Sequence, residues 1–326
     1  MATFHRAVHR FVHSSWGYPL ARGRSAATSI QQRSSSAGAA RRHHQWIYDG
    51  KNDGTAHAGR ESLMSDLGTA AAPSRELTVV LGDDHVATLE IDRPPSNHFS
   101  PGLIRQIADA CDELAADARC RAVVLCSAGR VFCAGADFTD THAIGTPDGT
   151  HLYDFAIRLF EQPLPMVAAI QGAAIGGGLG LAMAADFRVA APEARFAANF
   201  ALIGIHQGFA LSVTLPAAVG QQTALDLLYT GRRVGGAEAH GLGLADRLAE
   251  SGQARAQAHE LAAQIAGSAP LAVRSIRATM RRELADQARA AMAHERAEQE
   301  RLMETADWRE GLAAVSERRP ASFSGR

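Results

Sequence analysis

Three consecutive glycines, Gly176 to Gly178, separate an apolar stretch from an alanine-rich run that ends at Asp186. Glycine is a poor helix former with a high backbone entropy cost, so three together before a helix need a reason. A dinucleotide-binding turn requires G-x-G-x-x-G, and a P-loop requires G-K-[ST]; neither pattern is present. The turn instead favours an oxyanion hole, in which unpaired N–H groups at a helix N-terminus face a developing negative charge.

A second backbone donor is expected, since one N–H rarely stabilises an oxyanion alone. The loop at 133–137, Cys-Ala-Gly-Ala-Asp, follows the apolar run at 122–126 just as the glycine turn follows the run at 166–172. We therefore predict that the two loops meet and present one amide each.

Alternating strands and helices must position these loops. Hydrophobic patterning predicts strands at 77–81, 86–91, 122–126, 166–172 and 187–191, and helices at 101–118, at 153–160 and after the glycine turn. From Leu211 onward the pattern is mostly helical. The order of elements is typical of an α/β fold with a largely parallel sheet.

Composition excludes several classes of protein. The 326 residues are 46% hydrophobic and 21% charged, with a net charge of −1, which is typical of a soluble globular protein and gives no electrostatic argument for nucleic acid. The four cysteines lack metal-ligand spacing, so we expect no metal site and a reduced, intracellular protein. The uncharged stretch 162–185 is better explained by a strand, a turn and a helix than by a membrane span, because it contains several glycines and prolines.

The N-terminal segment differs from the rest of the chain. Residues 1–48 contain no acidic residue and are rich in arginine, serine and alanine, as in a mitochondrial transit peptide. Alternatively, Met64 is the true start of the protein. We expect residues 1–72 to be disordered, residues 73–250 to form the core and residues 251–326 to form a helical region. A cytoplasmic location is expected, or the mitochondrial matrix if the transit peptide is real.

Five motifs in order carry a family resemblance: "IDRPPSN" (91–97), "FCAGADF" (132–138), "AAIQGAAIGGGLGLAMAADFRVAA" (168–191), "TGRRVGGAEAHGLGLAD" (230–246) and "ERRPASF" (317–323). Together they resemble the crotonase, or enoyl-CoA hydratase/isomerase, superfamily. The resemblance implies a ββα spiral with a C-terminal helical region that forms a homotrimer or a dimer of trimers. It also implies an acyl-CoA substrate, no separate cofactor, and an enolate oxyanion held by the amides of Ala136 and Gly177.

The sequence departs from the hydratase pattern at the residues that move protons. Hydratases of this family use two glutamates, and by motif register these fall at Gly180 and Phe200. An aspartate used by other members falls near Gly208. Because all three positions lack a carboxylate, we expect a reaction other than standard hydration, such as isomerisation, C–C cleavage, thioester hydrolysis or decarboxylation. The alternative is an acyl-CoA-binding protein with little or no turnover, and a nucleotide-dependent oxidoreductase is a distant third.

Other side chains are candidates for the missing chemistry. His206 follows the Phe200 segment, and histidine as a residue type suits acid–base chemistry near neutral pH. A histidine that is simply hydrogen-bonded in a loop or at a subunit interface is the somewhat stronger explanation. His151 and Tyr153 open the helix before the glycine turn, where simple capping or packing is the competing explanation.

The resemblance also indicates residues that contact coenzyme A. Ser96, His98 and Ala134 are expected to line the CoA site, together with Gly135 and Asp137 of the oxyanion loop. Arg318 and Arg319, beside Phe323, are candidates for phosphate contacts.

Overall fold

The computed structural model describes residues 44–46, 76–138, 140 and 142–326. Most of the expected disordered segment 1–72 lies outside these residues, as do the transit peptide and the alternative start at Met64. Within it, three residues depart from the expectation, because β1 (His44–Trp46) pairs with β2 (Leu77–Leu81).

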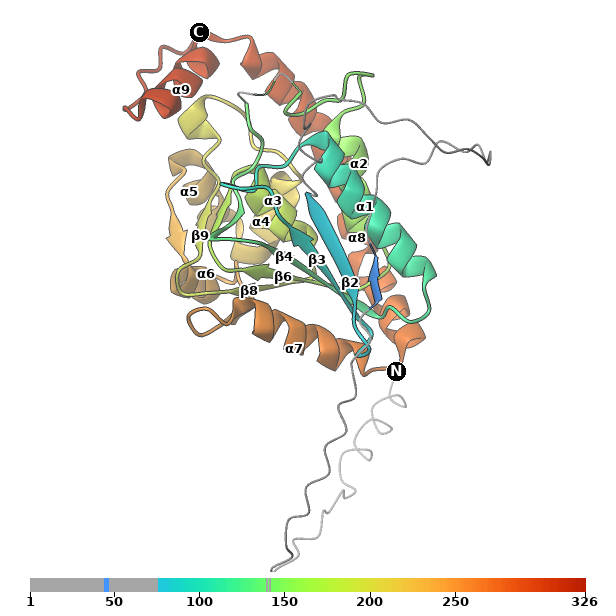
Figure 1. The fold of residues 1–326 in the computed structure, drawn as a ribbon. Helices are drawn as coiled ribbons and strands as arrows, with labels where there is room; N and C mark the ends of the chain where they lie inside the picture. The colour runs from blue at the N-terminus through green and yellow to red at the C-terminus, as the bar shows by residue number, and fades with distance from the viewer. Residues whose placement is uncertain (1–43, 47–75, 139, 141) are drawn as a thin grey trace, which may run out of the picture. The chain divides into compact units, whose positions relative to one another are not determined.

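A seven-stranded sheet forms the centre of the described chain (Figure 1). Its remaining strands are β3 (Val86–Ile91), β4 (Ala122–Ser127), β6 (Met166–Ile170), β8 (Phe187–Ala190) and β11 (Arg247–Leu248), and the order is β1-β2-β3-β4-β6-β8-β11. The strands from β3 to β11 are parallel to their neighbours, whereas β1, β2 and β3 pair antiparallel. The predicted α/β class and the five predicted strands are therefore confirmed, with small differences at their ends.

Both faces of this sheet are buried by helices. Side chains alternate along β4, so that Val123 and Leu125 belong to one core while Val124 and Cys126 belong to another. The first core contains residues of α1 (Pro101–Ala116) and α2 (Leu152–Glu161), and the second is covered by α7 (Ala254–Ala266), which runs below the sheet in Figure 1. Burial on both faces explains why β4 reads as a continuous apolar run.

A second, smaller sheet positions the loops. It has the order β10-β9-β7-β5, with β5 (Val131–Cys133), β7 (Ala173–Ile175), β9 (Arg195–Ala197) and β10 (Val234–Gly235). The strands β5, β7 and β9 are parallel, so their carboxyl ends meet at one edge. Sequence reasoning missed this sheet, because strands of two or three residues are too short to show an alternating pattern.

The remaining regular elements of the described chain are helical. These are α3 (Gly177–Ala184), the 3₁₀ turn η1 (Ala201–Ile203), α4 (Leu211–Val219), α5 (Gln221–Thr230), α6 (Gly236–Leu242), α8 (Pro270–Met303) and α9 (Ala306–Glu317). The predicted boundary after residue 250 lies between β11 and α7.

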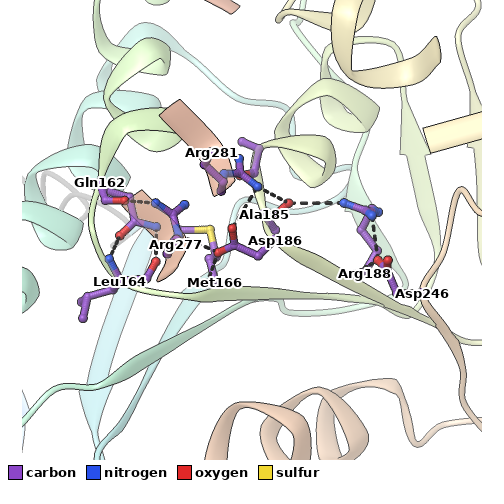
Figure 2. A network of polar contacts seen from close by, with 10 residues as sticks. Gln162, Leu164, Met166, Ala185, Asp186, Arg188, Asp246, Arg277 and Arg281 are labelled. Carbon is purple, nitrogen blue, oxygen red and sulfur yellow. Dashed lines mark hydrogen bonds and ion pairs between the residues drawn. The ribbon is translucent and has the colours of Figure 1, made fainter. Parts of the chain in front are cut away.

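A buried charge cluster attaches the long helix α8 to the sheet (Figure 2). Asp186, at the end of α3, accepts from Arg277 Nε and Arg281 Nη1, each at 2.9 Å, and from Met166 N at 2.8 Å. Arg277 is 7% exposed, and both arginines also donate to main-chain carbonyls. Burial lowers the pKa of Arg281, which Asp186 partly offsets. One carboxylate is therefore the shared counter-ion of two arginines that α8 inserts into the protein.

Asp186→Ala is expected to lower the free energy of unfolding by about 3 kcal/mol, because it leaves two buried guanidinium groups without a counter-ion. Glu161→Ala is the matched control, since Glu161 pairs with the more exposed Arg289 of the same helix; its expected cost is at most about 1 kcal/mol. Urea denaturation of both variants measures the difference. Equal losses would contradict the importance of burial.

Candidate active site

The carboxyl ends of three parallel strands supply the backbone of the site. β5 leads into the loop 134–138, β7 leads into Gly176 and the N-terminus of α3, and β9 leads into Asn199 and Phe200. Ligands bind preferentially outside the carboxyl ends of parallel strands, where successive loops converge. The two loops that the sequence singled out are thus neighbours in space.

Gly135 lies directly against the first turn of α3. A Cβ added to Gly135 would lie 2.9 Å from Ile175 O and 3.2 Å from Gly177 N, and its φ of +85° is a conformation that favours glycine. Within the described residues, the amides of Ala136 and Gly177 have no hydrogen-bond acceptor. Gly177 is the first residue of α3, where amides lack a partner within the helix and the helix dipole is positive. Both amides are therefore free to donate to a bound group, and their role as oxyanion donors stays a prediction.

Ala136 and Gly177 both line a cavity of about 600 Å³. Apolar side chains form most of its wall, and the C-terminal helix α9 contributes to one side. The lining residues are His98, Phe99, Ala134, Gly135, Ala136, Asp137, Phe138, Ile144, Leu152, Tyr153, Gly176, Gly177, Asn199, Phe200, Ile203, Gly208, Phe209, Gln299, Leu312, Ala313, Val315 and Ser316. A cavity of this size and character suits an apolar ligand with one polar group near the amides.

The space beside Gly180, where the first family glutamate falls by motif register, is occupied by a residue that lies outside α3. A Cβ on Gly180 would lie 2.4 Å from Cβ and 2.9 Å from Cγ of Phe209, a fully buried residue. The second glutamate position is Phe200, whose ring lines the cavity. Neither of these two phenylalanine side chains can transfer a proton.

The position of the family aspartate is filled as well. A Cβ on Gly208 would lie 2.0 Å from the hydroxyl oxygen of Tyr153 and 2.5 Å from Nε2 of Gln299. The Tyr153 hydroxyl donates to Gln299 Oε1 at 3.0 Å and accepts from Phe209 N at 3.1 Å. Burial strongly raises the pKa of Tyr153. This predicted catalytic candidate thus lies in the cavity wall, but its hydroxyl is neutral and already paired.

His151 lies beside the cavity wall as a helix cap. Its Nδ1 accepts from Tyr153 N at 3.1 Å, and its own amide donates to Asp154, which completes a capping box at the start of α2. The ring is 5% exposed and does not line the cavity. Burial, together with the nearby Arg296, lowers the pKa of His151 to about 4.

His151→Asn is expected to remove a pH dependence of stability while preserving the cap, because asparagine is also a good N-cap residue. The folded-state pKa of about 4 lies below the unfolded value of 6.5, so the unfolded chain binds more protons between these pH values. The stability contributed by neutral His151 is therefore complete above pH 6.5 and is lost as the pH falls towards 4. Urea denaturation at pH 7 and pH 5 measures how much free energy of unfolding is lost between these two pH values. This loss should be smaller in His151→Asn than in the unaltered chain by about 1–2 kcal/mol. An equal loss in the two proteins would contradict the prediction.

His206 does not reach the cavity, contrary to the role expected from its position in the sequence. It is absent from the lining, its Nδ1 lies 2.8 Å from Gln207 O, and its ring packs on that of His294 in α8. Its carbonyl oxygen accepts from Gln299 Nε2 at 3.0 Å. Its ring therefore turns towards α8, while only its main chain supports the site.

The predicted CoA-contacting residues lie on the oxyanion loop or on the neighbouring 93–99 loop. Of these, His98, Ala134, Gly135 and Asp137 line the cavity, whereas Ser96 does not. Ser96 instead accepts from Ala134 N at 3.1 Å through its carbonyl oxygen, which ties the 93–99 loop to the oxyanion loop.

The arginines near the C-terminus are occupied elsewhere. Arg319 pairs with Glu310 and Glu317 on α9, and this pairing lowers the pKa of Glu310 to about 2. Arg318, with a φ of +54°, ends α9. The structure shows neither of them at the cavity.

Sequence reasoning missed several lining residues, among them Asn199, Phe209 and Gln299. Asn199 directly precedes a position that was considered, so its polar type was an available signal. Phe209 and Gln299 reach the cavity only because α4 and α8 fold over it, and no local motif marks them.

The described residues offer neither a metal-binding cluster nor a membrane-spanning helix. They contain no group of three or more His, Cys, Asp or Glu side chains that could hold a metal ion. Among the helices of that same part of the chain, none is long and apolar enough to span a bilayer.

Comparison with known proteins places this geometry among related chains. A family model described as enoyl-CoA hydratase/isomerase matches residues 82–326. A putative enoyl-CoA hydratase of Thermus thermophilus is 36% identical over 252 residues, covering 73% of this chain and 97% of that protein. A probable enoyl-CoA hydratase of Bacillus subtilis is 33% identical over 74% of this chain and 96% of that protein. The crystal structure of an enoyl-CoA hydratase/isomerase from Pseudoalteromonas atlantica covers 76% of this chain and 100% of its own, with a TM-score of 0.70 and 33% identity.

Proposed function

We propose that this chain, which belongs to the enoyl-CoA hydratase/isomerase family, acts on an acyl-CoA thioester whose enolate is stabilised by the amides of Ala136 and Gly177. The observation that carries the proposal is the close approach of Gly135 to the first turn of α3, which brings Ala136 and Gly177 to the wall of one cavity. Removal of one oxyanion donor typically costs about 2.7–4 kcal/mol of transition-state stabilisation, so this pair is a sufficient source of catalysis.

The reaction is proposed to differ from standard hydration. Adding water to a double bond needs a base for the water and an acid for the α-carbon. Phe209, Phe200 and the Tyr153–Gln299 pair fill the places of the family's carboxylates, and His206 lies elsewhere. Cleavage of a C–C bond, as in decarboxylation, suits this cavity better. Carbon dioxide leaves, the bonding electron pair passes into the thioester, and the amides hold the enolate oxygen. The α-carbon then takes a proton from water, so no protein base has to remove a proton from carbon.

The rest of the substrate is proposed to follow the cavity wall. The acyl group lies among Phe99, Phe138 and Phe200, and the CoA moiety leaves past His98 and Ala134. We also propose that copies of the chain associate through α8, on which Leu271, Ile276 and Met280 are strongly exposed. A trimer-based assembly would cover these apolar side chains.

Mass spectrometry of a mixed acyl-CoA panel incubated with the full chain tests the proposal. Loss of carbon dioxide, a retro-aldol fragment, an isomerised product or release of free CoA would support it and identify the reaction class. Gain of one water by an enoyl-CoA at the rate of a standard hydratase would overturn the proposed departure from hydration.

A second candidate function is acyl-CoA binding without turnover. It is favoured by the paired hydroxyl of Tyr153, by Phe209 filling the space beside Gly180, and by the phenylalanine at position 200. Binding of several thioesters in the panel without conversion of any would favour this function.

A further inference from the structure

His98 contacts the peptide group that carries one of the two oxyanion amides. Its Nδ1 lies 3.2 Å from Gly135 O, and the same oxygen accepts from Phe99 N at 3.0 Å. A carbonyl oxygen only accepts hydrogen bonds, so Nδ1 must carry the proton in this contact. The imidazole is thereby fixed in one tautomer by a main-chain oxygen of the site.

Gly135 C=O and Ala136 N–H belong to one planar peptide unit. Hydrogen bonds donated to the oxygen draw electron density from the nitrogen, so the N–H becomes a stronger donor towards a substrate oxyanion. The two bonds also fix the plane of the peptide, which matters because Gly135 has a φ of +85° and no side chain to hold it.

The loop that carries His98 is itself held firmly. Arg93 Nη1 donates to His98 O at 2.8 Å, and Glu76 pairs with Arg93 at 3.0 Å. Asn97 is 2% exposed; it accepts from Arg93 N and donates to Ala128 O and Val131 O. This network supports the imidazole on the 93–99 loop beside the oxyanion loop.

We infer that His98 is a positioning residue of the oxyanion hole, which polarises the Gly135–Ala136 peptide through Nδ1–H and strengthens the Ala136 amide. The inference rests on the proposed function, because it assigns the means by which one of the two proposed donors is strengthened.

Isotope-edited infrared spectroscopy of a saturated acyl-CoA, labelled with ¹³C at the thioester carbon and bound to the full chain, tests the inference. Binding to the unaltered chain should lower the carbonyl stretching frequency. In His98→Leu this lowering should shrink by about 10–30%, the strengthening expected from one hydrogen bond in a chain. His98→Asn should retain the full lowering, because its Nδ2–H takes the place of Nδ1–H.

The control is His240→Leu, which removes a second Nδ1 contact with a main-chain carbonyl, Ala245 O at 3.2 Å, away from the cavity. It should leave the frequency unchanged. An unchanged frequency in His98→Leu would overturn the inference while leaving the oxyanion hole intact. Equal losses in His98→Leu and His98→Asn would also overturn it, because His98 would then act through Nε2. Absence of any lowering in the unaltered chain would overturn the proposed function, and the inference with it.

Discussion

Gly135→Ala is expected to reduce turnover of the acyl-CoA substrate about 100-fold, the lower end of the loss seen when one oxyanion donor is removed. The new methyl group would lie 2.9 Å from Ile175 O and 3.2 Å from Gly177 N, both of which are main-chain atoms. The two loops must move apart to make room, so the Ala136 and Gly177 amides no longer point at the same oxygen. The measurement is kcat for the conversion that the thioester panel identifies.

Gly149→Ala is the matched control for this effect. Gly149 has a φ of +86°, nearly the value at Gly135, but nothing lies within 4 Å of an added Cβ. It should show the same backbone strain, about 1–2 kcal/mol of stability, with turnover retained. If both variants kept full turnover, the close approach of the two loops would not be required for catalysis.

The sequence was sufficient to predict that the loop at 133–137 and the glycine turn at 176–178 meet. Gly135 and Gly177 are informative because a neighbouring loop leaves no room for a side chain at either position, and this requirement for bare backbone is visible in the residue type. The strands at 77–81 and 86–91 were equally predictable, because the turn at 82–85 and the periodicity agree.

The side chains of the site were much less predictable. His206 was placed near the cavity by its position along the chain, yet its ring faces α8 and only its carbonyl supports Gln299. Position along a loop fixes where the main chain runs, whereas the direction of a side chain depends on which helix packs against it. Gln299 lies on α8, the helix whose Arg277 and Arg281 pair with Asp186. Asp186 stands more than a hundred residues earlier in the chain, so no local pattern connects it with the cavity.

A glutamate cannot simply be restored at the first vacant position. Gly180→Glu is expected to lower the free energy of unfolding by more than about 3 kcal/mol, since overpacking alone costs about 1–3 kcal/mol and a buried carboxylate adds to it. Its Cβ would lie 2.4 Å from Cβ of Phe209, which is 1% exposed and cannot withdraw. Gly241→Glu, in helix α6 with nothing within 4 Å of an added Cβ, is the control and should change stability little.

Removing the obstruction should recover the fold. In Gly180→Glu/Phe209→Gly, the side-chain atoms at 2.4 and 2.9 Å from the new Cβ are gone, and only the main-chain oxygen of residue 209, at 3.1 Å, remains close. Glycine also suits the φ of +59° at residue 209. Thermal denaturation should then show a melting temperature above that of Gly180→Glu alone, although Phe209→Gly by itself destabilises the core. A lower melting temperature in the double variant would show that Phe209 contributes more as core than it obstructs as a neighbour.

The chemistry can be tested once the fold is recovered. Adding Phe200→Glu to the double variant places carboxylates at both positions that hydratases of the family use, in front of amides that are already present. This triple variant should add water to a 2-enoyl-CoA faster than the unaltered chain does, because general acid and base groups typically contribute about 10²–10⁴-fold each when they are correctly placed. A folded triple variant that binds the thioester but adds no water would mean that the cavity, and not only its missing carboxylates, is built for a different reaction.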